Sequence, residues 1–190
     1  MEKGDKRCAV IRAALELVAE HGFHGAPMSL VAERAGVAAG TIYRYFESKD
    51  ALMNATYHHL EERILATILE GYPEGRPIRE RFLHIGRGLV RYMISSPQEF
   101  RFLEQFHDSP YGVEHRREKL LGKGEGNHLV DLFEQGRREQ IVKDLPNPIL
   151  FSLAVGPLTH MCRDSILGFV TLDDRLVAES VEACWDAIRR

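Results

Sequence analysis

One stretch of the chain, built around a single glycine, limits what the chain can fold into. Residues 32–50 read AERAGVAAGTIYRYFESKD, with Gly36 between two short segments of helical character. Glycine adopts a left-handed backbone at little cost, so it can end one helix and turn the chain into the next. Helix, short turn and second helix form the helix-turn-helix plan, whose second helix enters the major groove of DNA. The stretch therefore predicts a DNA-reading unit.

The rest of the chain predicts helices throughout, because its apolar residues recur at steps of three and four. The fold class is all-α, with about nine helices. The expected helices are 6–20, 27–35, 39–46, 48–71, 78–95, 97–108, 127–139, 148–167 and 172–188, with a short further one at 113–121. Gly156-Pro157 should kink the helix at 148–167, because proline interrupts the backbone hydrogen bonds of a helix.

Gly36–Leu52, reading GVAAGTIYRYFESKDAL, resembles the signature of the TetR family of one-component transcriptional repressors. The likeness runs over about residues 6–60, whereas across 70–190 only length and helix order are similar. It implies a homodimer with two domains per chain. Residues 1–52 would form a three-helix DNA-binding domain, and 53–190 a larger ligand-binding and dimerisation domain. The helix at about 48–70 would bridge the two.

The same resemblance implies a palindromic operator in double-stranded DNA and an unknown small-molecule inducer. The implied DNA contacts come from the second and third helices and the start of the fourth: Ser29, Ala39, Gly40, Thr41, Tyr43, Arg44, Tyr45 and Lys49. Small residues at 39 and 40 would let DNA come close, the hydroxyls would reach phosphates, and Arg44 could grip a guanine. Ile42 and Phe46 should pack inward. The alternative is that the two tyrosines edge the core and Arg44 is solvated.

Two details of this region bear on its local structure. Family members carry Ser or Thr where Ala26 and Pro27 stand here, so the helix cap and phosphate contact from that hydroxyl are lost or pass to Ser29. Ser48 should cap the fourth helix, with Asp50 in its first turn. Arg34 is expected near the DNA backbone.

Aromatic residues cluster between 100 and 111, beside the helix break at Ser109-Pro110. Core packing explains any one of them, but such a cluster also suits an adaptable pocket wall. The expected ligand-binding residues are Phe100, Phe106, His107, Phe133, Phe151 and His160, which suggests a hydrophobic or aromatic inducer. The expected dimer interface, a four-helix bundle, uses Phe151, Val155, Leu158, Val177, Val181 and Trp185.

Charge and motifs narrow the function classes. The net charge is −3, and residues 1–60 carry seven Lys or Arg against seven Asp or Glu, so DNA affinity must depend on where the cations point. An enzyme or carrier using His107, His115 and His160 is the competing hypothesis. No HExxH, nucleophile elbow or cysteine-rich metal spacing supports it, and the glycine-rich 122–126 lacks the Lys-Ser/Thr of a phosphate-binding loop. We therefore expect no catalytic site, metal or cofactor.

Three scattered cysteines favour free thiols in a reducing cytoplasm. The longest apolar runs are too short to span a membrane, and the N-terminus does not resemble a secretory signal. These features predict a cytoplasmic protein with no membrane partner.

Overall fold

The computed structural model describes residues 3–120 and 127–190, so the glycine-rich segment 122–126 lies outside the described residues. The chain forms two compact units. Unit 1 comprises Met1–Arg63 and Ser96–Glu114, and unit 2 comprises Ile64–Ser95 and His115–Arg190. The division differs from the expected boundary after residue 52, because unit 1 also takes in a segment from the middle of the chain.

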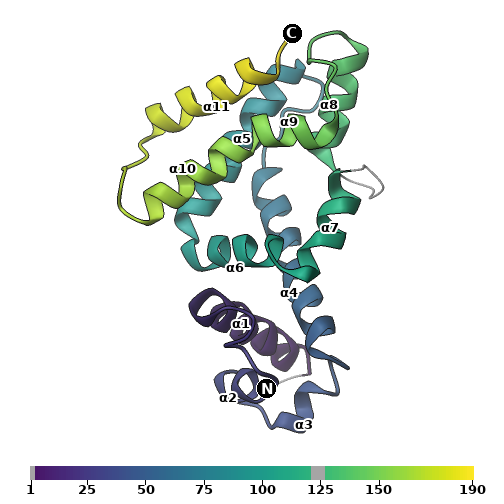
Figure 1. Cartoon of the computed structure of the whole chain (residues 1–190), viewed down its shortest axis with the longest axis vertical. Coiled ribbons are helices and arrows are strands. Elements are labelled where there is room, and N and C mark those ends of the chain that lie inside the picture. The colour runs from purple at the N-terminus through teal and green to yellow at the C-terminus, as the bar shows by residue number, and fades with distance from the viewer. Residues whose placement is uncertain (1–2, 121–126) are drawn as a thin grey trace. The chain divides into compact units, whose positions relative to one another are not determined.

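All regular structure in the described residues is helical, apart from one isolated bridge between Val142 and Arg189. Unit 1 contains α1 (Lys3–His21), α2 (Met28–Arg34), α3 (Ala39–Ile42), most of α4 (Lys49–Ile68), α6 (Pro97–His107) and the start of α7 (Pro110–Leu120). Unit 2 contains the end of α4, α5 (Ile78–Ser95), the rest of α7, α8 (His128–Arg138), α9 (Asn147–Ala154), α10 (Gly156–Ile166) and α11 (Asp174–Ile188). Figure 1 labels these helices along the chain.

The predicted all-α fold is confirmed, but several helix ends were predicted wrongly. The helix expected at 148–167 is two helices that meet at Val155, because Pro157 has no N–H to continue the hydrogen-bond ladder. The last helix begins at Asp174, capped by the Asp173 carboxylate, which accepts a hydrogen bond from the Leu176 N–H at 2.7 Å. Glycine and proline therefore predicted where helices break, but the sequence did not predict the residue at which the next helix begins.

Residues 96–99 read SPQE, the pattern of a capping box with proline in the first turn, but the start of α6 departs from this pattern. Pro97 lies in its first turn as predicted, but the Ser96 side chain makes no capping hydrogen bond. Glu99, the other half of the expected capping box, instead accepts a hydrogen bond from Arg63 of α4 at 2.6 Å. A contact between helices has replaced a contact within one helix.

Unit 1 is organised around α1, which packs against α2 on one side and against α6 on the other (Figure 1). The apolar stripe of α1 is buried as its spacing predicted, with Val10, Ala14, Leu17 and Val18 inaccessible to solvent. Burial of such side chains away from water is the main favourable contribution to folding.

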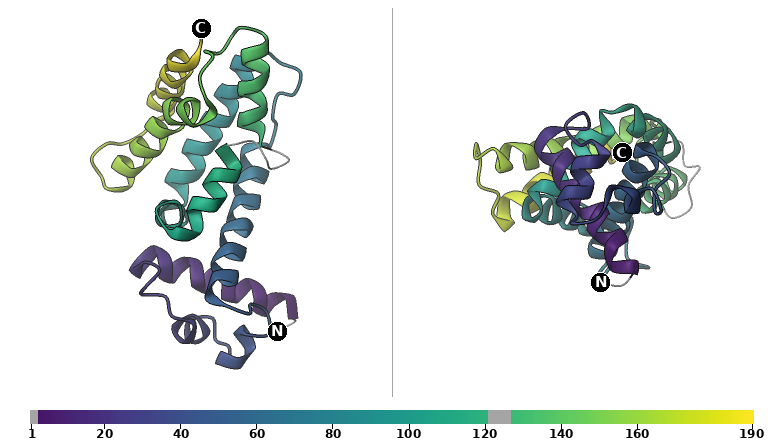
Figure 2. Two further views of the ribbon diagram at one scale, coloured as in Figure 1. Left: turned by 45° about the vertical axis from the view of Figure 1, so that its right-hand side comes forward. Right: turned by 90° about the horizontal axis from the view of Figure 1, so that it is seen from below.

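In unit 2, α5 lies between α8 on one side and α10 with α11 on the other, as two views show (Figures 1 and 2). Gly86 permits the close contact between α5 and α11, because a Cβ there would lie 2.5 Å from Cγ1 of Val181. One turn away, the rings of Phe82 and Trp185 pack with centroids 5.5 Å apart. This core depends on a small residue facing large ones.

Gly86→Ala should therefore destabilise the protein despite alanine's better helix propensity. We expect a loss of about 1–3 kcal/mol from overpacking, reduced by about 1 kcal/mol of propensity. Urea unfolding followed by circular dichroism measures the difference. Gly156→Ala is the control, because a Cβ at Gly156 would meet nothing within 4 Å among the described residues. Equal stability of the Gly86 variant and the wild type would contradict the proposed packing.

Candidate nucleic-acid interface

The turn between α2 and α3 is built by Gly36, as the sequence predicted. Gly36 has a φ of +64°, in the left-handed region. Its N–H donates to the Glu33 carbonyl at 3.0 Å, and the Val37 N–H donates to the Ala32 carbonyl at 2.9 Å. These two bonds form the Schellman arrangement that ends a helix at a left-handed glycine. The turn therefore holds α2 and α3 at a defined angle.

The segment after the turn is shorter as a helix than predicted. Helix α3 ends at Ile42, and 43–45 continue as a turn, so the expected helix at 39–46 was too long. The N–H groups of Tyr45 and Phe46 both donate to the Ile42 carbonyl at 2.9 Å. Ile42 and Phe46 are buried, as expected. Their burial leaves Tyr43, 57% exposed, and Arg44 on the outer face.

The other predicted DNA contacts lie at varied depths. Ser29, Ala39 and Gly40 are exposed, whereas Thr41 and Tyr45 are half-buried. The Lys49 ammonium donates a hydrogen bond to the Phe23 carbonyl, so it also ties α4 to the segment that follows α1. That structural role was not foreseen, because Phe23 lies 26 residues earlier in the sequence. The DNA-contact assignments themselves stay predictions.

Arg34, expected near the DNA backbone, forms an exposed ion pair with α1. Its guanidinium donates to both carboxylate oxygens of Glu20, at 3.2 and 3.0 Å, and lies 3.6 Å from Glu16. The Glu20 hydrogen bond raises the pKa of Arg34, and the same bond lowers the pKa of Glu20. The pair fastens α2 to α1, so α2 is held against the helix behind it.

The start of α4 is fixed from two sides. The Ser48 hydroxyl accepts a hydrogen bond from the Ala51 N–H at 3.0 Å, which confirms the predicted cap. The Tyr111 hydroxyl donates a hydrogen bond to the Asp50 carboxylate. Burial is the main reason that the pKa of Tyr111 is raised, and the neighbouring carboxylate raises it further. Sequence reasoning missed this contact, because no local pattern links Asp50 with Tyr111.

The aromatic cluster predicted as a pocket wall is packed inside unit 1. Phe100 and Phe106 are at most 2% exposed, and the ring of Phe106 stacks on Tyr57 with centroids 4.2 Å apart. Phe23 contacts Phe102, Phe106 and Tyr111 at centroid distances of 5.3–6.4 Å. His107 is exposed. The cluster forms the core between α1, α4 and α6.

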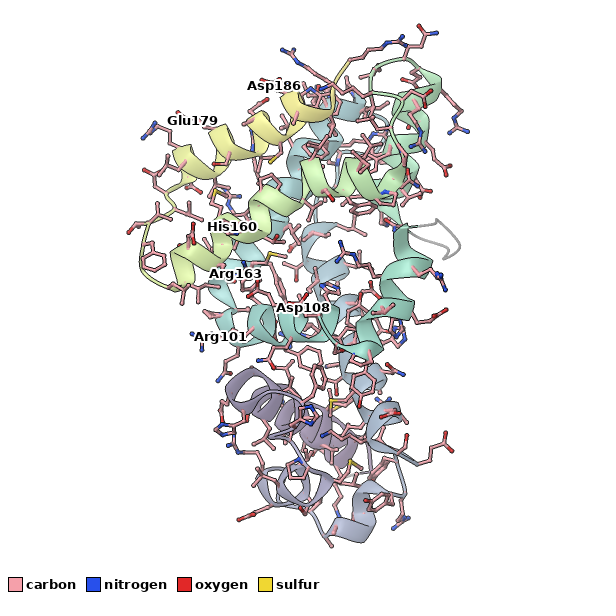
Figure 3. The ribbon with its side chains drawn as sticks, viewed as in Figure 1. Arg101, Asp108, His160, Arg163, Glu179 and Asp186 are labelled. Atoms are coloured by element: carbon pink, nitrogen blue, oxygen red, sulfur yellow. The ribbon has the colours of Figure 1, made fainter. Side chains whose placement is uncertain are left out.

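The remaining predicted ligand residues belong to unit 2. Phe133 and Phe151 make an edge-to-face contact with centroids 5.3 Å apart, so their packing needs no ligand. His160 is exposed on α10, close to Arg163 (Figure 3). The six expected ligand residues are therefore not brought together within either unit.

Most of the expected dimer residues face the core of their own subunit. Four are at most 3% exposed in the single chain: Leu158, Val177, Val181 and Trp185. Phe151 and Val155 are half-buried. Side chains of α9, α10 and α11, among them the buried Leu158, line a hollow of about 280 Å³: Leu153, Pro157, Leu158, Met161, Ser180, Ala183, Cys184 and Ala187.

Two other kinds of site are absent from the described residues. Within 3–120 and 127–190, no group of three or more His, Cys, Asp or Glu side chains could hold a metal ion. Across the same residues, no helix combines the length and apolar character that crossing a membrane requires.

The fold and the exposed segment at 39–45 define a helix-turn-helix protein. Residues 10–56 match the model of the bacterial regulatory proteins of the tetR family, and 77–189 match that of the tetracyclin repressor-like C-terminal domain. The chain belongs to the TetR family of transcriptional regulators, whose members bind DNA and act as dimers.

Individual relatives agree with this assignment. An uncharacterised helix-turn-helix regulator of Haemophilus influenzae is 26% identical over 99% of this chain and 98% of its own. The fatty acid metabolism regulator protein of Bacillus subtilis is 32% identical over 42% of this chain and 41% of its own. A TetR-family crystal structure from Marinobacter aquaeolei is 25% identical, with a TM-score of 0.87 over 98% of this chain and 96% of that one.

The pairing of Arg34 with Glu20 predicts how acid affects stability. Because the folded state lowers the pKa of Glu20 below its ordinary 4.5, the folded protein binds fewer protons there than the unfolded chain. The ion pair therefore stabilises the fold fully at a pH well above the ordinary pKa of Glu20, which is 4.5. This stabilisation is lost as the pH falls through the lowered pKa of the folded state. We expect Glu20→Gln to lower the melting temperature at pH 7 more than at pH 3. A deficit that is the same at both pH values would contradict the pairing.

Proposed function

We propose that this protein is a repressor that a small hydrophobic or aromatic inducer releases from a palindromic operator. The observation that carries the proposal is the division of one short segment into two faces. Ile42 and Phe46 hold the segment to the core, while Tyr43 and Arg44 project into solvent. An exposed tyrosine beside an exposed arginine has no packing role, and both suit the surface of a duplex.

The chemistry of the outer face fits base and phosphate contacts. Arg44 can donate two parallel hydrogen bonds to O6 and N7 of guanine, worth about 1–3 kcal/mol of discrimination. The Tyr43 hydroxyl can donate to a phosphate, and its ring can contact a thymine methyl. Ser29 and Thr41 supply hydroxyls for the phosphates at either side.

Gly40 supports the same assignment. A Cβ at Gly40 would meet nothing within 4 Å among the described residues, and φ there is not in the left-handed region. Nothing within the described chain therefore requires glycine at this position. An approaching DNA strand would, because a glycine lets another backbone come closer.

Dimerisation would present residues 39–45, which we call the reading segment, twice. Two such segments on palindromic DNA must lie about 34–36 Å apart, or a multiple of this, to enter successive major grooves on one side of the duplex. Small side chains such as Ala183, Ala187 and Ser180 let helices approach closely, so we assign the dimer contact to the face of α11 that carries them, beside Pro157 and Met161 of α10. A repressor acts where the DNA is, which points to the cytoplasm.

The inducer would act by binding one dimer geometry more tightly than the other. A tenfold difference in affinity between the two states corresponds to about 1.4 kcal/mol of coupling. The name of the Bacillus subtilis relative, a fatty acid metabolism regulator, fits a hydrophobic inducer.

Tyr43→Ala should weaken operator binding by about tenfold or more, because it removes both a phosphate donor and a base contact. Tyr43→Phe should lose less, since it keeps the ring. Fluorescence anisotropy with a labelled operator measures the affinity, and thermal melting and sedimentation confirm an intact dimer. Val113→Ala, which shortens another exposed apolar side chain, is the control. Unchanged affinity for Tyr43→Ala would show that the reading surface lies elsewhere.

The operator is best sought upstream of the protein's own coding region. A gel-shift assay with that DNA should give specific retardation that weakens as salt rises, because phosphate contacts release counterions. If neither this DNA nor any palindrome in a random library is bound at low salt, the repressor hypothesis fails.

A further inference from the structure

A hollow of about 720 Å³ lies in unit 2, in a region that the sequence did not single out. It runs along one face of α5, beside the last turn of α4 and the connection that follows it, and we call it the α4–α5 groove. Its lining residues are Thr67, Ile68, Glu70, Pro73, Glu80, Leu83, His84, Arg87, Gly88, Arg91, Tyr92 and Ser95. Fifteen residue steps along α5 correspond to about 22 Å, so the groove suits an elongated molecule.

The two helices that line the groove approach each other closely at Gly88. A Cβ at Gly88 would lie 3.3 Å from Cα of Ile68, so only a very small residue fits there. His84 fixes the same contact, since its Nε2 lies 3.0 Å from the Ile68 carbonyl oxygen and must donate to it. With Nε2 engaged, Nδ1 of His84 is the remaining polar atom of the ring.

Arg87 carries a buried donor that lacks a partner. Its Nε is shielded from solvent and has no hydrogen-bond partner among the described residues. The guanidinium reaches Glu182 only at 4.0 Å, and that carboxylate already accepts hydrogen bonds from Arg79 at 2.7 and 2.6 Å. A buried donor left unpaired costs free energy, so a rotation of the Arg87 side chain that brought its guanidinium to an acceptor in the groove would be favoured.

Arg91 lies one turn further along the same face, at the four-residue spacing that brings helical side chains together. Its partner is Asp174 at 2.9 Å, but both side chains are largely exposed. An exposed ion pair contributes little and is easily exchanged. Arg91 can therefore join Arg87 in binding an incoming anion.

Two carboxylates also line the groove. Glu80 is two turns before Arg87 and is paired with Arg76 at 2.9 Å. Glu70 belongs to the connection after α4. The groove thus combines Arg87 and Arg91, which also face Glu182 and Asp174 of α11, with apolar walls from Ile68, Leu83 and Tyr92.

We propose that the α4–α5 groove binds an effector whose anionic head group, a carboxylate or a phosphate monoester, is held by Arg87 and Arg91. The apolar body of the effector lies against Ile68, Leu83 and Tyr92. Planar guanidinium groups bind such oxyanions through paired hydrogen bonds, which makes two arginines on one face a suitable head-group site. The regulatory part of this assignment rests on the proposed function, since it makes the bound molecule the inducer.

The test compares three probes of equal chain length: octanoate, octyl phosphate and octanol. Isothermal titration calorimetry on the full chain without DNA should detect at least one of the two anions and not octanol. The tighter anion identifies the head group. The double variant Arg87→Gln/Arg91→Gln should bind that anion about tenfold to a hundredfold more weakly, because charged hydrogen bonds are lost. Arg101→Gln, at an exposed position of α6 (Figure 3), should bind as the wild type does.

Melting curves without ligand report whether each variant folds. If the double variant fails to fold, the anion affinity of the single variant Arg91→Gln, changed at an exposed position, is compared with that of the wild type instead. The proposal is overturned if octanol binds as tightly as the anions, if the variants bind the anion unchanged, or if neither anion binds at millimolar concentration.

Operator affinity, measured separately, distinguishes the two proposals. The tighter anion should weaken the operator complex of the wild type but not that of the double variant. Anion binding without any operator binding would contradict the repressor function and leave the groove assignment standing. Operator binding without anion binding would contradict the groove assignment and leave the repressor function standing.

Discussion

A helix of four residues is not stable alone in water, so the reading segment depends on the two buried side chains that anchor it. Ile42 and Phe46 are 0% and 4% exposed, and burying side chains of this size contributes about 1.5–3 kcal/mol each. The Arg7 guanidinium also lies 5.4 Å from the centre of the Phe46 ring. The outward direction of Tyr43 and Arg44 is a consequence of this inward anchoring.

Ile42 and Phe46 are buried in unit 1, which is assembled from distant parts of the sequence. Phe102 and Phe106 of α6 pack against Phe23 and Tyr57, so α6 belongs to the same core as the helices that carry the reading segment. Helix α4 contributes residues to both units, with Leu52 and Leu60 buried in the first and Ile68 in the second. The proposed inducer effect would act through this one continuous helix.

Local patterns predicted much of this structure, and contacts between distant residues account for what they missed. Gly36, Ser48 and the inward Ile42 and Phe46 follow from backbone conformation, capping and helical period, which depend on near neighbours. The partners of Arg34 and Lys49 did not follow, because Glu20 and Phe23 are 14 and 26 residues away. Phe106 is predicted to line a pocket for the same reason: a hydrophobic side chain suits a pocket wall and a core equally well, and its distant packing partners are not evident from the sequence. The α4–α5 groove gave no sequence signal, because Arg87 and Arg91 form a common exposed-helix pattern.

The central claim is that the outer face of residues 39–45 meets the duplex, and amide chemical shifts test it most directly. The protein would be labelled with ¹⁵N and titrated with the DNA fragment that it binds, beside a scrambled fragment of equal length. The largest shift changes should fall on the amides of Ser29 and of residues 39–45, and only with the specific fragment. Unchanged shifts at Gly40, Tyr43 and Arg44, with large changes elsewhere, would contradict it.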